Sequence, residues 1–218
     1  MPHLLPASNM STTFNIIPTK IDSNLTFQNV LTLAKRTLQN QLDKLSINLS
    51  VDISVNIHDN KEAYVNDVIL DTKFVWANNE YAWFTVDKSN GGTDGYCETI
   101  AENLSDWDTY IEDTLDNVPM TPQLKQQIVD CGYEWYFRRS AGQSPITSLA
   151  FGHLAAAVAK LTDGYIYTYD GAWNDNIFPA RAEQLLEVYF YPDKAKVAAD
   201  FDWVTRCIDG LHAEFASR

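Results

Sequence analysis

The chain has 218 residues, 45% of them apolar, which is enough for one domain with a continuous core. Its formal net charge of −13 opposes binding to nucleic-acid phosphates or to an anionic membrane surface. No window approaches the roughly 18 consecutive apolar residues that a membrane-spanning helix needs, and the amino end does not resemble a secretory leader. We therefore expect one cytoplasmic domain over residues 1–218, with residues 1–12 as a loose lead-in. The oligomeric state does not follow from composition.

The first half of the chain is predicted to carry one helix and several strands. After Thr26 as a capping residue, apolar residues recur at three- and four-residue spacing up to Leu45, which predicts a helix. Strict alternation of apolar and polar residues over 47–57 predicts a strand with one buried face. We expect the later strands to form a four-stranded antiparallel meander with a tight turn at Asn78 and Asn79. The predicted strands are 14–17, 47–57, 63–70, 72–77 and 81–87.

Glycines at 91, 92 and 95 interrupt this pattern, and the second half is predicted to be mostly helical. A capping residue followed by proline, at Thr121-Pro122 and at Ser144-Pro145, marks the start of two helices. Gly164 lies where a helix is expected to end with a residue in the left-handed backbone conformation. One late strand is expected over 165–169. In the last helix, apolar residues from Val197 through Phe201 to Phe215 form a regular inner stripe. The predicted helices are 105–117, 121–135, 145–161, 179–190 and one from 193 onward.

This order of elements predicts the fold class. Strands dominate early, helices dominate later, and no linker or repeat divides the chain. We expect an α+β domain in which a mainly antiparallel sheet of about four to six strands carries helices on one face. The apolar aromatic residues of the central strands are expected in its core: Phe74, Trp76, Trp83 and Phe84.

The sequence contains no metal or cofactor motif. Its four histidines lack HExxH and HxH spacing, and GxSxG, GxxxxGK[ST] and GxGxxG patterns are missing. We therefore predict no catalytic residue, no metal and no cofactor. His153 lies on the buried side of its helix and is expected to be a hydrogen-bonded core residue. Cys97, Cys131 and Cys207 are far apart and are expected to be reduced, buried thiols.

The negative charge is concentrated in one segment. Between Lys88 and Lys125 there are eight acidic residues and no Lys or Arg. On the helix predicted there, the acids lie opposite the apolar arc, and like charges four residues apart cost about 0.2 to 0.5 kcal/mol per pair. Two hypotheses follow: a solvated face that serves solubility, or a docking surface for a basic protein. The acids of this face are Asp106, Asp108, Glu112, Asp113 and Asp116.

A second candidate surface is aromatic. Alternation along the late strand places its three tyrosines on one face, and exposed Tyr and Trp beside acids are good interface anchors. A carbohydrate-binding platform would use the same residue types. Because acids are abundant, a hydrolase with a carboxylate pair also remains an alternative. The aromatic residues and neighbouring acids are Tyr165, Tyr167, Tyr169, Asp170, Trp173 and Asp175.

The segment from Ser144 to Asp193 resembles bacterial immunity proteins encoded beside polymorphic toxins of Rhs, contact-dependent or type VI systems. The similar features are the alanine-rich helix 146–161, the glycine stop with the strand after it, the Asp170-Gly171-Ala172-Trp173 turn and Phe178-Pro179-Ala180. The resemblance implies a small non-enzymatic protein that binds and neutralises one cognate toxin, which we expect to be basic. The predicted partner-binding residues are Asp106, Asp108, Glu112, Asp113, Asp116, Tyr167, Tyr169, Asp170 and Trp173.

Overall fold

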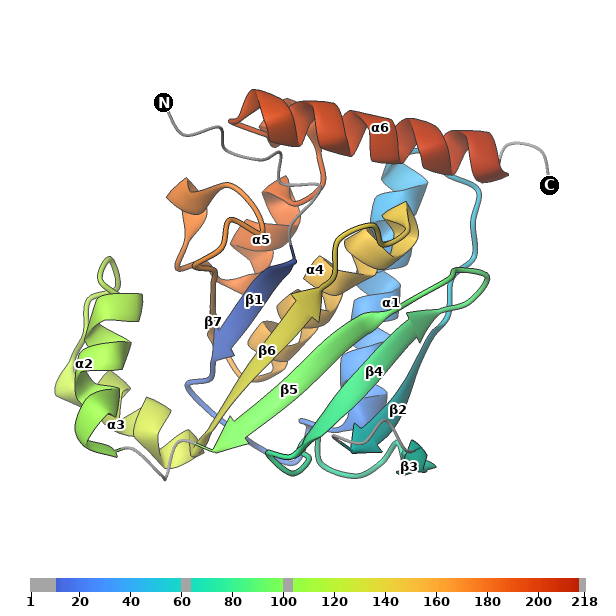
Figure 1. Ribbon diagram of the computed structural model, residues 1–218. Coiled ribbons are helices and arrows are strands. Elements are labelled where there is room, and N and C mark those ends of the chain that lie inside the picture. The colour runs from blue at the N-terminus through green and yellow to red at the C-terminus, as the bar shows by residue number, and fades with distance from the viewer. Residues whose placement is uncertain (1–10, 60–63, 100–103, 216–218) are drawn as a thin grey trace.

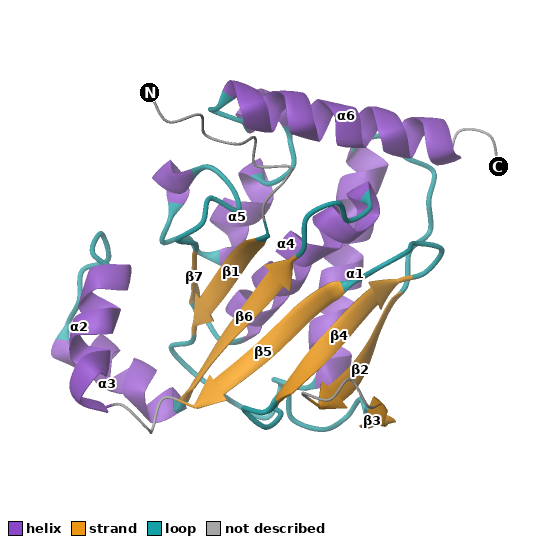
Figure 2. Ribbon diagram, viewed as in Figure 1, coloured by secondary structure: helices purple, strands orange, loops and turns teal. Residues whose placement is uncertain are grey.

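The computed structural model describes residues 11–59, 64–99 and 104–215. Within them, one antiparallel sheet has the strand order β3-β2-β4-β5-β6-β1-β7, which confirms the α+β class (Figure 1). Figure 2 shows α1, α4 and α5 behind this sheet, α6 across its upper end, and α2 and α3 beside its β7 edge. The strands are β1 (Thr12–Ile17), β2 (Ile53–Asp59), β3 (Tyr64–Asp67), β4 (Glu80–Val86), β5 (Thr93–Thr99), β6 (Tyr133–Arg139) and β7 (Tyr165–Tyr167). The α-helices are α1 (Phe27–Lys44), α2 (Leu104–Thr114), α3 (Pro122–Cys131), α4 (Pro145–Leu161), α5 (Ala182–Val188) and α6 (Ala198–Phe215).

The two long helices of the core begin at the capping residues that the sequence predicts. Thr26 Oγ1 accepts a hydrogen bond from the Asn29 N–H at 3.2 Å, at the start of α1. Ser144 Oγ accepts one from the Thr147 N–H at 3.3 Å, and Pro145 occupies the first helical position of α4. Each cap satisfies an N–H group that has no partner inside its helix.

Helix α4 is the centre of the core. It contacts α1, α5 and the strands β1 and β6, and every residue from Ile146 to Ala159 is buried. Its many alanines let the neighbouring elements approach closely. At Gly152 an added Cβ would lie 2.1 Å from Cε1 of Tyr189, so the tyrosine ring packs directly on the helix backbone. A glycine is therefore required at this position.

Helix α6 lies across one end of the helical layer (Figure 1). Arg139 at the end of β6 is only 6% exposed, and its guanidinium lies 4.5 Å from the centre of the Trp203 ring on α6. Val204 and Phe215 are buried, but Val197 is 54% exposed and Phe201 45% exposed. The predicted inner stripe is thus wrong at its beginning: Val197 precedes α6, which starts at Ala198, and Phe201 in its first turn is exposed.

The other face of the sheet is largely open. Among the described residues, α2 and α3 cover it only at the β7 edge, where they form a small second cluster with Ile17 and Tyr167. From β2 to β5 this face carries no helix in the described part of the chain (Figure 1), and on β6 the Tyr110 side chain of α2 reaches Glu134. We call it the open face; it consists of the side chains on the side of the sheet away from α1 and α4.

Several predicted strands are corrected by the structure. Residues 47–52 are alternately buried and exposed, as predicted, but they are not part of β2. Here the side-chain amide of Gln39, and not a neighbouring strand, forms hydrogen bonds with the backbone of Leu49 and Val51. The predicted strand 72–77 is irregular: Phe74 is buried, yet its carbonyl accepts from the indole N–H of Trp135 and only Lys73 forms a bridge. The predicted meander is also wrong, since β2 lies between β3 and β4.

Two central strands were missed by the sequence analysis. β5 contains Gly95, where an added Cβ would lie 2.7 Å from the Phe84 ring, so this glycine serves close packing and does not end the sheet. β6 follows α3 directly and includes Trp135, which was expected on the helix. At the end of α4 the left-handed position belongs to Asp163 at φ 46°, not to Gly164. Thr12 already begins β1, and residues 1–10 lie outside the described part.

Candidate functional site

A row of aromatic rings crosses the open face of the sheet. The Tyr96 and Tyr136 rings, in register on β5 and β6, stack with centroids 4.6 Å apart. Tyr81 on β4 lies 6.1 Å from Tyr96, and His58 on β2 stacks on Tyr81 at 5.2 Å. All four side chains are half-buried although no described helix covers them. The rings therefore present a continuous apolar strip that is still accessible from one side.

Charged groups flank this strip. Asp94 on β5 lies between Trp83 on β4 and Arg138 on β6, and its carboxylate is 3.7 Å from the Arg138 guanidinium. The Asp94 side chain is only 13% exposed, and burial raises its pKa, an effect that Arg138 partly offsets. Trp83 was expected in the core, but the structure places it half-buried on the open face, beside Gly92.

Where the open face meets α2, the surface forms a small pocket. Its volume is about 280 Å³, and the lining side chains come from β1, β5, β6, α2 and the segment after β7. Its charged lining residues are all acidic, and no Lys, Arg or His of the described chain lines it. The lining residues are Thr13, Asn15, Glu98, Tyr110, Glu134, Tyr136, Tyr169 and Asp170.

Glu134 on β6 lines this pocket and is only 7% exposed. Its Oε1 accepts hydrogen bonds from the Tyr110 hydroxyl of α2, at 2.8 Å, and from the Tyr167 hydroxyl of β7. Burial raises the pKa of the Glu134 carboxyl to about 7, although both hydroxyls act to lower it. Burial also raises the pKa of both tyrosines, so they remain hydrogen-bond donors at neutral pH.

A second carboxylate stands directly opposite. Glu98 on β5 is in register with Glu134 and is exposed, and its charge adds to the burial that raises the pKa of the Tyr136 hydroxyl. Directly opposed residues of antiparallel strands have Cβ atoms about 4.5 to 5.5 Å apart. The arrangement offers two chemical uses: acid–base work by a carboxylate pair, or the binding of a cationic group between two carboxylates.

The predicted acidic helix exists as α2, and its outer acids are at the surface. Glu112 and Asp113 are exposed on α2, and Asp116 is exposed just after it. Glu112 is ion-paired with Lys125 of α3 at 2.9 Å, so part of its charge stabilises the α2–α3 contact. The side chains of Asp106 and Asp108 lie outside the described residues.

The predicted aromatic surface is only partly exposed. Tyr169 is 71% exposed, and the Asp170 carboxylate accepts a hydrogen bond from the Thr13 N–H at 2.9 Å. Tyr167 and Trp173 are 3% and 2% exposed, so the expectation that they anchor a partner at the surface is wrong. Tyr167 is covered because α2 and α3 pack over the end of β7, and Trp173 packs against Tyr189 in the core.

Six further residues of the open face were not identified from sequence. The predicted strand 81–87 was correct in place and Phe84 is in the core as expected, but Trp83 was also assigned to the core and Tyr81 was given no role. β5 and β6 were not predicted; in β6 the aromatic residues Tyr133, Trp135 and Phe137 recur at every second position, which was the available signal, whereas β5 has only Tyr96 as an aromatic residue. The missed residues are Tyr81, Trp83, Tyr96, Glu98, Glu134 and Tyr136.

His153 has the structural role that the sequence predicts, and of the three cysteines expected to be buried only Cys97 is, since Cys131 and Cys207 are half-buried. His153 is fully enclosed between Thr37 and Gln41 of α1, at 2.9 and 2.6 Å, and burial lowers its pKa to about 3. The three thiols are free; Cys97 is buried, and burial raises its pKa to about 12. Within the described ranges no cluster of three metal-ligating side chains occurs, and no helix is long and apolar enough to cross a membrane.

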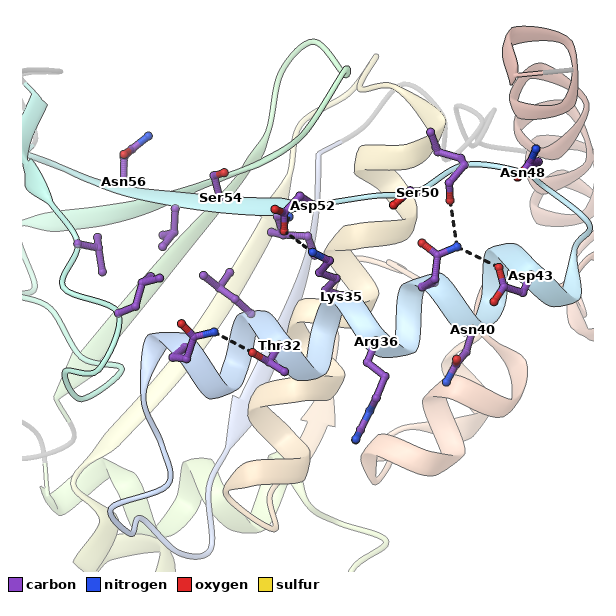
Figure 3. Close-up of a pocket in the computed structure, with 18 residues that line it drawn as sticks. Thr32, Lys35, Arg36, Asn40, Asp43, Asn48, Ser50, Asp52, Ser54 and Asn56 are labelled. Atoms are coloured by element: carbon purple, nitrogen blue, oxygen red, sulfur yellow. Dashed lines mark hydrogen bonds and ion pairs between the residues drawn. The ribbon is translucent and has the colours of Figure 1, made fainter. Parts of the chain in front are cut away.

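A larger hollow of about 1060 Å³ lies between α1 and the chain leading into β2 (Figure 3). Its polar side chains bond to one another: Lys35 pairs with Asp52 at 2.9 Å, and Gln39 bonds Asp43 at 2.9 Å and the Leu49 carbonyl. These contacts tie α1 to residues 49–52, so the groove is explained by the packing of the fold.

The open face and the acidic pocket at its edge are therefore the candidate functional site. No protein-family model, curated protein or solved structure matches this chain, so the functional assignment rests on the chemistry of the site itself.

Proposed function

We propose that this chain is a non-enzymatic immunity protein that binds and neutralises a basic bacterial toxin in the cytoplasm. The observation that carries the proposal is the open face, where half-buried Trp83, Tyr96 and Tyr136 lie beside carboxylates with no described helix above them. Protein interfaces concentrate Tyr and Trp at their centre, and such residues carry most of the binding energy. The acids at the rim select a partner of positive charge.

Helix α2 extends this surface. Its exposed acids, Glu112, Asp113 and the neighbouring Asp116, add negative charge beside the open face, and we include Asp106 and Asp108 of the same helix in the proposed contact. Charges at the edge of an interface mainly accelerate association and make it salt-dependent.

The segment after β7 contributes one exposed anchor. Tyr169 is exposed, and its hydroxyl lies 2.6 Å from Thr114 Oγ1 at the end of α2. Asp170 is held by the N–H of Thr13. Buried Tyr167 and Trp173 support this segment from below and do not touch the proposed partner.

A nuclease toxin fits this surface chemically. Enzymes that act on nucleic acids are basic where they contact phosphate, and an acidic protein surface can occupy that region in place of the substrate. The resemblance of residues 144–193 to immunity proteins concerns α4, β7 and α5, which build the core, so it bears on the fold and not on the identity of the toxin.

A hydrolase that uses Glu98 and Glu134 is the second candidate. The observation in its favour is the opposed pair of carboxyl groups, one of which has its pKa raised to about 7. Against it, the pocket of about 280 Å³ is smaller than the roughly 300 to 1,000 Å³ of sites that hold small-molecule substrates. The Tyr110 and Tyr167 hydroxyls also occupy one oxygen of Glu134.

Co-expression with a candidate toxin domain, to be sought in the gene next to the one that encodes this chain, tests the proposal. We expect growth rescue by the wild-type chain and a purified complex whose affinity falls by about 30-fold or more in Trp83→Ala or Tyr96→Ala. Phe201→Ala is the matched control, because Phe201 is an exposed aromatic residue on α6, outside the open face.

Unchanged affinity in both open-face variants would show that the surface is wrongly assigned. Turnover of a glycoside or ester by the purified chain, lost in Glu134→Gln, would instead favour the hydrolase.

A further inference from the structure

The acidic pocket between the open face and α2 has the composition of a cation receptor. Three carboxylates and three tyrosines line it, and no basic side chain of the described chain does. Elsewhere on the same face Asp94 has Arg138 as a cationic neighbour, so the missing countercharge is specific to this pocket. The carboxylates are Glu98, Glu134 and Asp170, and the tyrosines are Tyr110, Tyr136 and Tyr169.

The hydrogen bonds of Glu134 leave one oxygen unoccupied. Both tyrosine hydroxyls donate to Oε1, and no donor for Oε2 is found among the described residues. Among the described residues, three side-chain atoms are fully enclosed and have no partner: Trp76 Nε1, Thr93 Oγ1 and Trp173 Nε1. Glu134 Oε2 is not among these enclosed atoms. Glu134 is only 7% exposed, and one oxygen of its carboxylate has no hydrogen-bond donor among the described residues, so this oxygen is a strong acceptor for a donor from a ligand.

The geometry selects a planar cation with several donors. Glu98 and Glu134 face each other across adjacent strands, so one group with N–H donors on two sides can reach both carboxylates. A guanidinium has this fork of donors and stacks on aromatic rings, whereas an ammonium is a compact charge without a flat face. The exposed ring of Tyr169 offers such a face at the pocket, and the half-buried ring of Tyr136, which stacks on Tyr96 with one face, lines the pocket as well.

We propose that this pocket receives one arginine side chain of the protein partner, with the guanidinium between Glu98 and Glu134 Oε2. The identification of a protein as the source of the arginine rests on the proposed function. The preference for a guanidinium rests on the pocket alone. The volume of about 280 Å³ fits the end of one side chain and leaves the rest of the partner on the open face.

The pocket is tested without a partner by NMR titration of the full chain at pH 8 with methylguanidinium. We expect saturable shifts of tyrosine ring signals at the pocket, with a dissociation constant on the order of 1 to 10 mM. Methylurea, which has a similar shape and no charge, should bind at least about tenfold more weakly.

Two isosteric variants locate the binding. Glu134→Gln keeps an acceptor for both tyrosines but puts an amide donor at the Oε2 position, and Glu98→Gln removes the facing charge; each should weaken methylguanidinium binding at least about tenfold. Glu187→Gln, an exposed acid on α5, is the control and should bind as the wild type does. Equal binding of methylurea, or full binding in both pocket variants, would overturn the assignment.

The source of the guanidinium is tested with two further probes. An arginine residue blocked at both ends should bind at least as tightly as butylguanidinium, which has the same charge and no backbone, if the pocket is open to a protein side chain; a clear preference for butylguanidinium would overturn the protein source. The outcomes remain separable from the proposed function. A toxin complex that forms while methylguanidinium fails to bind refutes only the pocket, and probe binding without any toxin complex refutes only the function.

Discussion

Gly152 and Gly210 form a matched pair at the scale of single residues. Both are helical, but an added Cβ at Gly152 meets the Tyr189 ring at 2.1 Å, whereas at Gly210 the nearest atom is 3.9 Å away. We expect Gly152→Ala to destabilise the fold by about 1 to 3 kcal/mol, because the ring cannot move without disrupting the core. Gly210→Ala should be neutral or stabilising by up to about 1 kcal/mol, since alanine favours the helix.

Chemical denaturation of both variants measures the difference in the free energy of unfolding. Equal stability of the two proteins would mean that the contact of Tyr189 with the α4 backbone is not tight.

Glu134 predicts a pH dependence of stability. Its folded pKa of about 7 lies above the unfolded value of 4.5, so the folded state binds more protons between these two pH values. The stabilising contribution of the protonated carboxyl is therefore present at lower pH and is lost as the pH rises through 7. Between pH 6 and pH 8, we expect the free energy of unfolding of the wild type to fall by about 1 kcal/mol more than that of Glu134→Gln.

Urea denaturation at the two pH values checks this expectation. Glu187→Gln is the control, because Glu187 is exposed and should leave the pH dependence of the wild type in place. If Glu134→Gln loses stability as steeply as wild type, the buried carboxyl does not titrate in this range.

Helix α2 carries the next prediction, at the scale of elements. Asp113 and Asp116 are exposed near its end, whereas Glu112 is bound to Lys125 and helps to hold α3. We expect the double variant Asp113→Asn, Asp116→Asn to associate several-fold more slowly with the toxin at low salt, with a weaker salt dependence of the association rate. Dissociation should change little, because exposed rim charges act mainly on the encounter.

Stopped-flow or surface binding kinetics at two salt concentrations provide the measurement. Asp43→Asn is suited as the control, since Asp43 lies on α1 by the groove of Figure 3, where it bonds Gln39. An unchanged salt dependence in the double variant would assign the α2 acids to solubility alone.

Across the whole molecule, two clusters of buried residues differ in size. The main core joins α1, α4, α5 and α6 to the sheet, while α2 and α3 rest on a small cluster around Ile111 and Ile128. Local opening is easiest where few apolar contacts must be broken. We therefore expect amide hydrogens of α2 and α3 to exchange faster than those of α1 and α4.

Native-state hydrogen exchange with the variant Tyr110→Phe tests this hierarchy. The variant removes one of the two hydroxyls that bind Glu134, and α2 should exchange still faster while α4 is unaffected. A uniform increase over the whole chain would mean that both clusters open together.

Helix starts were predictable from sequence because their causes are local. A side chain that caps its own helix needs only neighbours within three residues, as Thr26 and Ser144 show, and the apolar spacing of α1 and α4 follows from 3.6 residues per turn. The strand partners depend on residues far apart in the chain. The apolar and polar residues over 47–55 are alternately buried and exposed, as the pattern predicts, yet part of that segment is hydrogen-bonded to Gln39 and not to a neighbouring strand.

The functional surface required the tertiary structure. Composition and residue order were enough for the acidity of the chain, the α+β class and the buried role of His153, since charge, spacing and burial on one helix face are properties of short segments. The pairing of Glu98 with Glu134 joins residues on β5 and β6, and α2 and α3 separate these strands in sequence. Sheet register brings the two carboxylates together, and the packing of α2 beside them turns a strand face into a pocket.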